Sequence, residues 1–286
     1  MWPMRAHLCR SSATRSTSGF AMSLPHFYLD GQTLADEGAE TFPLLLASDD
    51  AKHARVLRLA PGEHIAVVDA DRDYFECEIV AFDGALPIVR IAQRFELAVG
   101  APSVVLVQGL AKGDKMETVI RHATELGVSG FLPLVCERSI VRLDAKKASA
   151  KVERWRAIAK SAAMQSGQPS VPDVREPCAL TQVCAQLAQA AAVLVCWEEA
   201  PGTARLDRAL DDAFDRLSLP EGACIAVVVG PEGGLSKREV EAILACNPCA
   251  SLVSLGPSIL RTETAGIVAP ALVLYELERR TRADAR

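Results

Sequence analysis

The sequence predicts an α/β fold with a mainly parallel sheet, preceded by a smaller β-rich domain. From residue 103 onward, short apolar runs alternate with amphipathic segments of helical length, a pattern typical of parallel sheets covered by helices. Before residue 99, short apolar runs are separated by turn signals, and one helix is indicated. The 286 residues, half of them hydrophobic, suffice for two cores.

The first zone, residues 22–98, is expected to form a small barrel. Its turn signals are Pro61-Gly62 and Asp83-Gly84. One helix is expected over Asp49–Arg58, with Ser48 as its N-cap. The expected strands are His64–Asp69, Tyr74–Val80 and Pro87–Ala92.

The second zone, residues 102–282, follows an expected linker at Val99–Pro102. Its expected strands are Val104–Leu110, Gly130–Val135, Ala192–Trp197, Cys224–Val229 and Leu252–Leu255. Its expected helices are Asp114–Leu126, Lys146–Ser166, Leu180–Ala190, Leu206–Leu217, Lys237–Ala245 and Thr262–Arg279. Gly127 and Gly167 are expected to end the first two helices.

Composition bounds the possible functions. No apolar run has the length of a membrane span, so we expect a cytoplasmic protein without a membrane partner. The net charge is −5, yet residues 138–160 hold eight Lys/Arg against two acids. This stretch is either a face that tracks phosphates or an ordinary solvated helix face. Residues 1–21, which contain arginines and no acid, are either a targeting segment or an extension upstream of a start at Met22.

Metal chemistry is not expected. The nine cysteines are interpreted as free thiols, several of them inside apolar runs. Cys246 and Cys249 form a CxxC motif, but it lacks the second pair that a zinc site requires.

The most specific segment runs from Val229 to Ser236, VGPEGGLS, between an expected strand and an expected helix. Its three glycines permit a tight turn that a flat ligand can approach closely, because no Cβ intervenes. The segment has neither the P-loop ending nor the GxGxxG pattern, which disfavours phosphate cradling. Ser236 and Glu239 have the spacing of a capping box. The alternative is a plain turn between strand and helix.

A second segment, Leu255 to Ala265, LGPSILRTETA, also leaves a strand and enters a helix. Leu255, Ile259 and Leu260 are expected to form an apolar slot for an adenine ring. Arg261 is a candidate for a polar or anionic substrate group, and its alternative role is an ion pair with Glu232.

GPEGG after a strand, followed by LGxxILRTETA, resembles the C-terminal signature of the SPOUT methyltransferases. The match is closest to the family that methylates N3 of a uridine in 16S ribosomal RNA. Two further segments also resemble this family, LAKGDKME at 110–117 and ATELGV at 123–128. In the first zone, the family's PUA-like barrel is resembled by HxxVLR at 53–58 followed by Pro61-Gly62. The resemblance covers about residues 24–278.

The resemblance implies a C-terminal domain with a trefoil knot, a PUA-like RNA-binding domain, a homodimer and the cofactor S-adenosyl-L-methionine (SAM). It implies cofactor contacts from three loops, and the expected residues are Trp197, Glu198, Val229, Gly230, Pro231, Glu232, Gly233, Gly234, Leu255, Gly256, Ile259, Leu260, Thr262 and Thr264. The expected partner is 16S rRNA, with RNA contacts at Arg58, Lys112, Lys115, Arg138, Arg142 and Lys146. The resemblance implies basic residues at three places where this chain has none: it has His122, His26 and the segment Gln168-Pro169-Ser170 instead.

The reaction requires an in-line nucleophile, and the uridine N3 must lose its proton. Arg261 is the expected cation for the anionic base, and Glu263 is expected beside it as a catalytic residue. The general base stays open between water, a cofactor carboxylate, Glu232 and Glu263. Three functional alternatives are considered: a SPOUT enzyme acting on another RNA such as tRNA, a non-catalytic RNA-binding protein of the same fold, and an oxidoreductase. The oxidoreductase would need a glycine fingerprint, which residues 106–113 lack.

Overall fold

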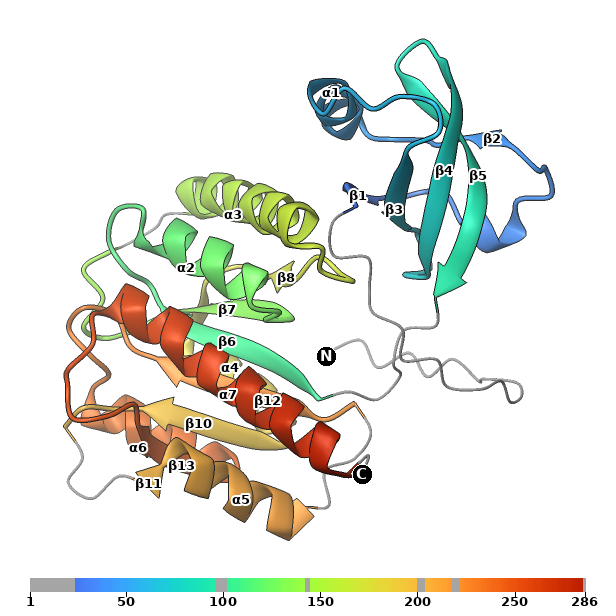
Figure 1. The fold of residues 1–286 in the computed structure, drawn as a ribbon. Helices are drawn as coiled ribbons and strands as arrows, with labels where there is room; N and C mark the ends of the chain where they lie inside the picture. Colours follow the sequence, from blue (N-terminus) through green and yellow to red (C-terminus); the bar gives the residue numbers. More distant parts are fainter. Residues whose placement is uncertain (1–23, 96–101, 142–144, 200–203, 218–221, 285–286) are drawn as a thin grey trace.

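A computed structural model describes residues 24–95, 102–141, 145–199, 204–217 and 222–284 (Figure 1). Within these ranges the chain forms two separate sheets, one from each expected zone. Residues 99–101 of the expected linker and residues 1–21 lie outside the described residues. No helix in these ranges combines the length and the apolar character that crossing a bilayer requires.

The N-terminal sheet has five strands in the order β1-β3-β4-β5-β2. β1 runs parallel to β3, and the other neighbours are antiparallel. Phe27, Ile65 and Phe75 are almost completely buried in its core. The strands are β1 (His26–Tyr28), β2 (Phe42–Pro43), β3 (His64–Val68), β4 (Tyr74–Asp83) and β5 (Leu86–Phe95), accompanied by a 3-10 helix (Leu34–Asp36) and α1 (Ser48–Val56).

Two expectations about this zone need correction. Ser48 does not cap α1, because the helix already includes it and Ala47 occupies the cap position without a side-chain hydrogen bond. The helix also ends at Val56 and cannot reach Arg58, whose φ of 55° lies in the left-handed region. The three expected strands are present, and the short strands β1 and β2 carried too little pattern to be predicted.

The C-terminal sheet confirms the predicted α/β fold with a mainly parallel sheet. Its order is β11-β13-β10-β12-β6-β7-β8, with β9 beside β7, and the strand pairings within the described ranges are parallel. The strands are β6 (Ser103–Gly109), β7 (Gly130–Val135), β8 (Asp173–Val174), β9 (Cys178–Ala179), β10 (Ala192–Cys196), β11 (Ala204–Arg205), β12 (Cys224–Val229) and β13 (Ala250–Ser254).

Helices cover both faces of this sheet, with α2, α3, α5 and α7 on one face and α4 and α6 on the other (Figure 1). Strand residues alternate between the two cores, so that Leu106 packs with the first group and Val107 with the second. The helices are α2 (Lys115–Glu125), α3 (Ala145–Ser166), α4 (Leu180–Leu187), α5 (Leu206–Leu217), α6 (Lys237–Cys246) and α7 (Thr262–Asp284). Gly127 and Gly167 end α2 and α3 with positive φ, as predicted.

The N-terminal sheet is attached to the C-terminal half of α3. The Tyr28 hydroxyl donates to the Gln168 carbonyl at 2.6 Å, and Lys160 pairs with the nearly buried Asp50 at 2.8 Å. Met164 of α3 packs against the N-terminal core. His26 is buried, hydrogen-bonds Tyr74 at 2.8 Å and lies against Gly167, where a Cβ would come 3.2 Å from its ring. His26, where the resemblance implies an arginine, therefore serves packing in this chain.

Leu44 and Leu45 give a matched test of the N-terminal core. Leu44 is fully buried, whereas Leu45 is 56% exposed. We expect Leu44→Ala to lower the free energy of unfolding by roughly 2–5 kcal/mol, because it leaves a cavity. Leu45→Ala should change it by less than about 0.5 kcal/mol. Denaturant unfolding of both variants measures the difference, and equal losses would contradict this packing.

Candidate functional site

The carboxyl ends of the parallel strands meet at one edge of the C-terminal sheet, where three loops surround a cavity of about 540 Å³. We name them the first cavity loop (197–199, after β10), the second (230–235, after β12) and the third (255–263, after β13 and into α7). Ligands of open α/β sheets bind at this edge, and cavities of this size hold small cofactors.

Most of the expected cofactor residues line this cavity. They are Trp197 and Glu198 from the first loop, Val229, Gly230, Pro231, Glu232 and Gly234 around the second, and Leu255, Gly256, Ile259, Leu260 and Thr262 around the third. Gly233 and Thr264 are not among the lining residues. Cys196, Val253 and Ser254 also line it, and nothing but their position at strand ends marked them in the sequence.

The second cavity loop depends on glycine. A Cβ on Gly230 would stand 2.9 Å from the Leu235 nitrogen, and one on Gly234, whose φ is 69°, would overlap the Glu198 carboxylate. Gly109, at the end of β6, lies so close to Pro231 that a Cβ there would overlap the proline ring. Ser236 caps α6, and Glu239 completes the predicted capping box. The segment is therefore a packed cradle, and the plain-turn alternative does not account for these close approaches.

A buried hydrogen-bond network ties the third loop to the second. The Thr262 hydroxyl donates to the Gly230 carbonyl at 2.6 Å, and the Gln108 amide donates to the Thr262 oxygen at 2.9 Å. Gln108 is 1% exposed in the strand β6. The sequence had not marked it as a site residue, although a single polar residue within the run Val104–Leu110 was a usable signal.

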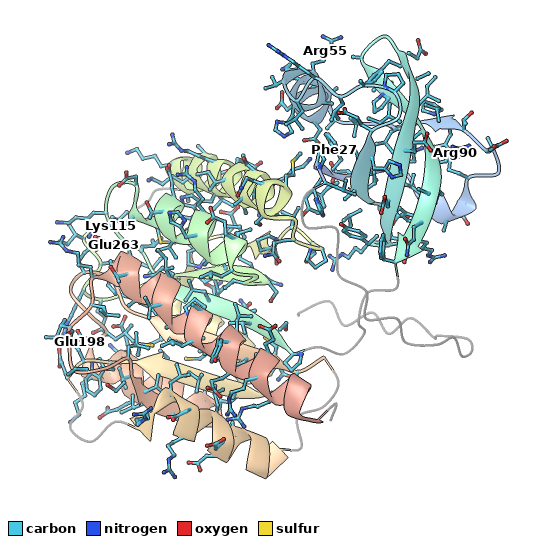
Figure 2. The ribbon with its side chains drawn as sticks, viewed as in Figure 1. Phe27, Arg55, Arg90, Lys115, Glu198 and Glu263 are labelled. Carbon is cyan, nitrogen blue, oxygen red and sulfur yellow. The ribbon has the colours of Figure 1, made fainter. Side chains whose placement is uncertain are left out.

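Lys115 bridges two carboxylates beside the cavity. Its Nζ lies 3.1 Å from Glu232 Oε1 and 3.1 Å from Glu263 Oε2. Figure 2 shows Lys115 and Glu263 together at the N-terminal ends of α2 and α7. These two close carboxylates, Glu232 first and Glu263 second, raise the pKa of Lys115.

Both glutamates are held in the ionised form. Partial burial favours the neutral form of Glu232, but the Lys112 N–H, the Glu232 N–H and Lys115 outweigh it and lower its pKa. The pKa of Glu263 is lowered by its own backbone N–H, against partial burial, and further by Lys115 and the charge of Arg261. The alternative ion pair between Glu232 and Arg261 does not form, since Glu232 pairs with Lys115.

Arg138 makes a second set of contacts at the cavity. Its Nη1 donates to Glu199 Oε1 at 2.6 Å and to the Gly233 carbonyl at 3.2 Å. Gly233 thus supports the site from behind the lining, because its backbone lies against Arg138. Hydrogen bonding to Glu199 and the charges of neighbouring glutamates raise the pKa of Arg138.

Arg261 differs from these two cations. It lines the cavity and is exposed, and within the described part of the chain its side chain has neither a hydrogen bond nor an ion pair. Ile259 beside it is 85% exposed, while Leu255 and Leu260 pack partly against the core. The apolar slot is therefore open on the side of Ile259, and Arg261 stands available to a substrate.

The expected RNA contacts are spread over the surface. Arg58 and Lys112 are exposed, whereas Lys115 and Arg138 are engaged at the cavity. Arg142 lies outside the described residues, and Lys146 lies in α3 with a side chain that is not described. The described residues contain no group of three or more His, Cys, Asp or Glu side chains placed to hold a metal.

The cavity fits the shape and chemistry of SAM. The glycines of the second loop leave backbone open to a flat ligand, and Leu255 and Leu260 supply an apolar wall for an adenine ring. Thr262 and the strand-end carbonyls are polar groups that fix a ligand's orientation.

Comparison with known proteins also indicates a methyltransferase. Residues 100–274 match the model of a family described as RNA methyltransferase domain. Ribosomal RNA small subunit methyltransferase E of Bacillus subtilis is 34% identical over 249 residues, covering 85% of this chain and 93% of that protein. The protein of the same name from Mycobacterium bovis is 33% identical and covers 85% of this chain and 88% of its own length.

This chain belongs to the ribosomal RNA small subunit methyltransferase E family. A solved family member from Neisseria gonorrhoeae, bound to S-adenosyl methionine, has a TM-score of 0.70 at 26% identity and covers 88% of this chain and 97% of its own. A Legionella pneumophila protein solved in complex with the cofactor SAM has a TM-score of 0.69 at 29% identity, with coverages of 88% and 96%. Methyltransferase E relatives thus match along both zones of the chain.

Gly234 tests the cradle of this methyltransferase E site. We expect Gly234→Ala to lower the free energy of unfolding by about 1–2 kcal/mol, because its φ of 69° is unfavourable for a residue with a Cβ. Gly38→Ala is the control, since Gly38 has open space around it and no positive φ. Denaturant unfolding of both variants decides, and an unchanged Gly234→Ala would show that this turn is not formed.

Proposed function

We propose that this chain transfers a methyl group from SAM to N3 of a uridine in the 16S rRNA of the small ribosomal subunit. The observation that carries the proposal is the glycine-lined cavity at the strand ends, built from the segments that resemble the family's cofactor loops. The names of the relatives, which act on ribosomal RNA of the small subunit, support the substrate.

SAM supplies an already activated methyl group. The protein's task is therefore to bind SAM, to orient the target uridine in line with the methyl group, and to stabilise the uridine anion. The exposed Arg261 guanidinium is suited to stabilise the uridine anion that forms when N3 loses its proton. Glu232 and Glu263, whose pKa values are lowered, are weak bases. We assign Glu263 to the charge arrangement around Arg261 and the N3 proton to water or a cofactor carboxylate.

The remaining assignments follow the family. A paired uridine hides its N3 edge, so the target must be unpaired or flipped out. We propose that residues 22–98 form a PUA-like RNA-binding domain, supported by its five-stranded sheet with α1. Arg58, Lys112, Arg142 and Lys146 are proposed to contact phosphates.

We propose that residues 102–282 carry the trefoil knot. The chain leaves β13, near one edge of the sheet, and its last helix α7 packs against α2, β6 and β12 nearer the middle. The packing of β6 against the second cavity loop at Gly109 and of Gln108 against Gly266 of α7 supports a tightly threaded arrangement.

A homodimer is proposed from exposed apolar side chains on α7 and at the cavity rim. On α7, Tyr275 is 64% exposed and Leu272 is 40% exposed, and Ile259 is open at the cavity rim. Exposed apolar groups that share one helix are typical of an interface. The active site would then lie close to the partner subunit.

The double variant Leu272→Asp/Tyr275→Asp tests the dimer. We expect the wild-type chain to sediment with the mass of two chains and the variant with the mass of one, because buried carboxylates destabilise an apolar interface. Leu45→Asp, at an exposed leucine of the N-terminal zone, is the control. Analytical ultracentrifugation decides, and a monomeric wild type would refute the proposal.

The reaction is tested with radiolabelled SAM and small ribosomal subunits from cells lacking this gene. We expect 3-methyluridine at one site by mass spectrometry, and a loss of about 100-fold or more in the rate for Arg261→Ala, the scale of removing one anion-stabilising group. Arg208→Ala, at an exposed arginine of α5, should keep the wild-type rate. Label on tRNA would favour the alternative substrate. SAM binding without methylation of any RNA would favour a binding protein, and absence of SAM binding would refute the enzyme.

A further inference from the structure

Lys115 and Arg138 come from outside the three cavity loops, and each contacts two of them. Lys115 begins α2, after β6, and reaches Glu232 of the second loop and Glu263 of the third. Arg138 follows β7 and reaches Glu199 of the first loop and the Gly233 carbonyl of the second. Together the two cations connect all three loops.

We propose that Lys115 and Arg138 are positioning residues that tie the three cavity loops into the shape that binds the cofactor. This inference rests on the proposed function and adds to it roles that differ from phosphate binding. Neither residue needs to touch the reacting atoms, because each acts through the carboxylates and the carbonyl that it holds.

The charges around Lys115 explain why the loops need it. The side chains of Lys115, Glu232 and Glu263 are only 26%, 27% and 22% exposed, so water screens their charges less than on an open surface. Both carboxylates lie against one ammonium group, and without it they would repel each other across the gap between the second and third loops. The backbone at Lys115 is held in position by the core, because the side chain of the next residue, Met116, is only 2% exposed.

The contacts of Arg138 are equally specific to the loops. A Cβ on Gly233 would come 3.0 Å from Arg138 Cβ and 3.1 Å from its carbonyl oxygen, so the second loop passes directly over this residue. The same guanidinium nitrogen that holds the Gly233 carbonyl also holds Glu199. Arg138 thereby fixes the distance between the first and second loops.

The same contacts disfavour a role in phosphate binding. The Lys115 ammonium group already has two carboxylate oxygens at 3.1 Å, so its charge is engaged within the site and is not free to pair with an RNA phosphate. Lys112, three residues earlier, is exposed, and only its backbone N–H is used at the site. The two lysines of the same segment are therefore assigned to different tasks.

The experiment uses the full-length chain and compares Lys115→Met and Arg138→Met with Lys115→Arg and with Arg121→Met, an exposed cation of α2. Calorimetry without RNA measures the Kd for SAM. We expect a rise of about tenfold or more in both methionine variants, the factor for one lost charge-assisted hydrogen bond. Lys115→Arg should recover most of the affinity, and Arg121→Met should equal the wild type.

Two readouts separate positioning from other roles. Amide hydrogen exchange without cofactor should accelerate in residues 230–235 and 255–263 of Lys115→Met, and in 197–199 and 230–235 of Arg138→Met. The salt dependence of RNA binding should keep its wild-type slope, whereas loss of a phosphate contact would reduce the slope by about one. Unchanged SAM affinity with a reduced slope would overturn the proposal in favour of RNA contacts.

The pH dependence gives a third readout. In the wild type, backbone N–H groups and Lys115 keep Glu232 and Glu263 ionised, and the charge of Arg261 adds to this at Glu263. SAM affinity should therefore stay flat from pH 8 to 6 and weaken only below the ordinary glutamate range of about 4.3. In Lys115→Met, the pKa of at least one of the two carboxylates should rise, because two like charges now face each other without the ammonium group. SAM affinity should then vary with pH in the variant, and a flat profile would contradict the bridge.

The outcomes also separate this inference from the proposed function. If the wild type binds no SAM, the proposed function fails, and hydrogen exchange still tests whether the two cations hold the loops. If the wild type binds SAM and both methionine variants bind it equally well, the positioning role fails while the methyltransferase assignment stands. Thermal unfolding without cofactor checks that each variant is folded.

Discussion

The parallel alignment of β6, β7, β10, β12 and β13 is the constraint on which the site depends. Parallel strands end at the same edge of the sheet, so segments that are far apart in the sequence meet there. The register sets Val229 of β12 beside Gln108 of β6, and Cys196 of β10 beside Val229. As a result Gln108, Gly230 and Thr262 join in one hydrogen-bond network although more than a hundred residues separate the first from the others.

Close backbone approach is the second physical requirement. A Cβ on Gly109 would collide with Pro231, one on Gly230 with Leu235 of the same loop, and one on Gly234 with Glu198 of the first cavity loop. The glycines therefore do more than permit a turn, because they let the second cavity loop pack against the end of β6 and against the first cavity loop while backbone groups stay open to a ligand. This dense packing explains why the GPEGG segment requires glycine at positions 230 and 234.

Ion pairs between side chains of this chain also hold the cavity loops together. Four glutamates occur in the three cavity loops; Lys115 forms ion pairs with two of them and Arg138 with a third. Arg261 is left at the rim without such a partner among the described residues, which makes its charge available to a substrate. The N-terminal sheet contributes nothing to this cluster, and it is held elsewhere, on the C-terminal half of α3, by Tyr28 and Asp50.

The sequence alone determined the α/β class, the order of the strands and helices along the second zone, and the segments that line the cavity. These predictions succeeded because apolar periodicity and glycine-rich turns are local properties of the sequence. It did not reveal the short strands β1, β2, β8, β9 and β11, the true start of α1 or the part played by Gln108, since short strands and a single buried amide leave almost no local pattern. Lys115 and Arg138 show the limit most clearly. Their positive charge predicted contact with RNA, whereas the fold brings carboxylates from distant loops to them, and a residue's electrostatic partner is decided by proximity in space, which only the tertiary structure sets.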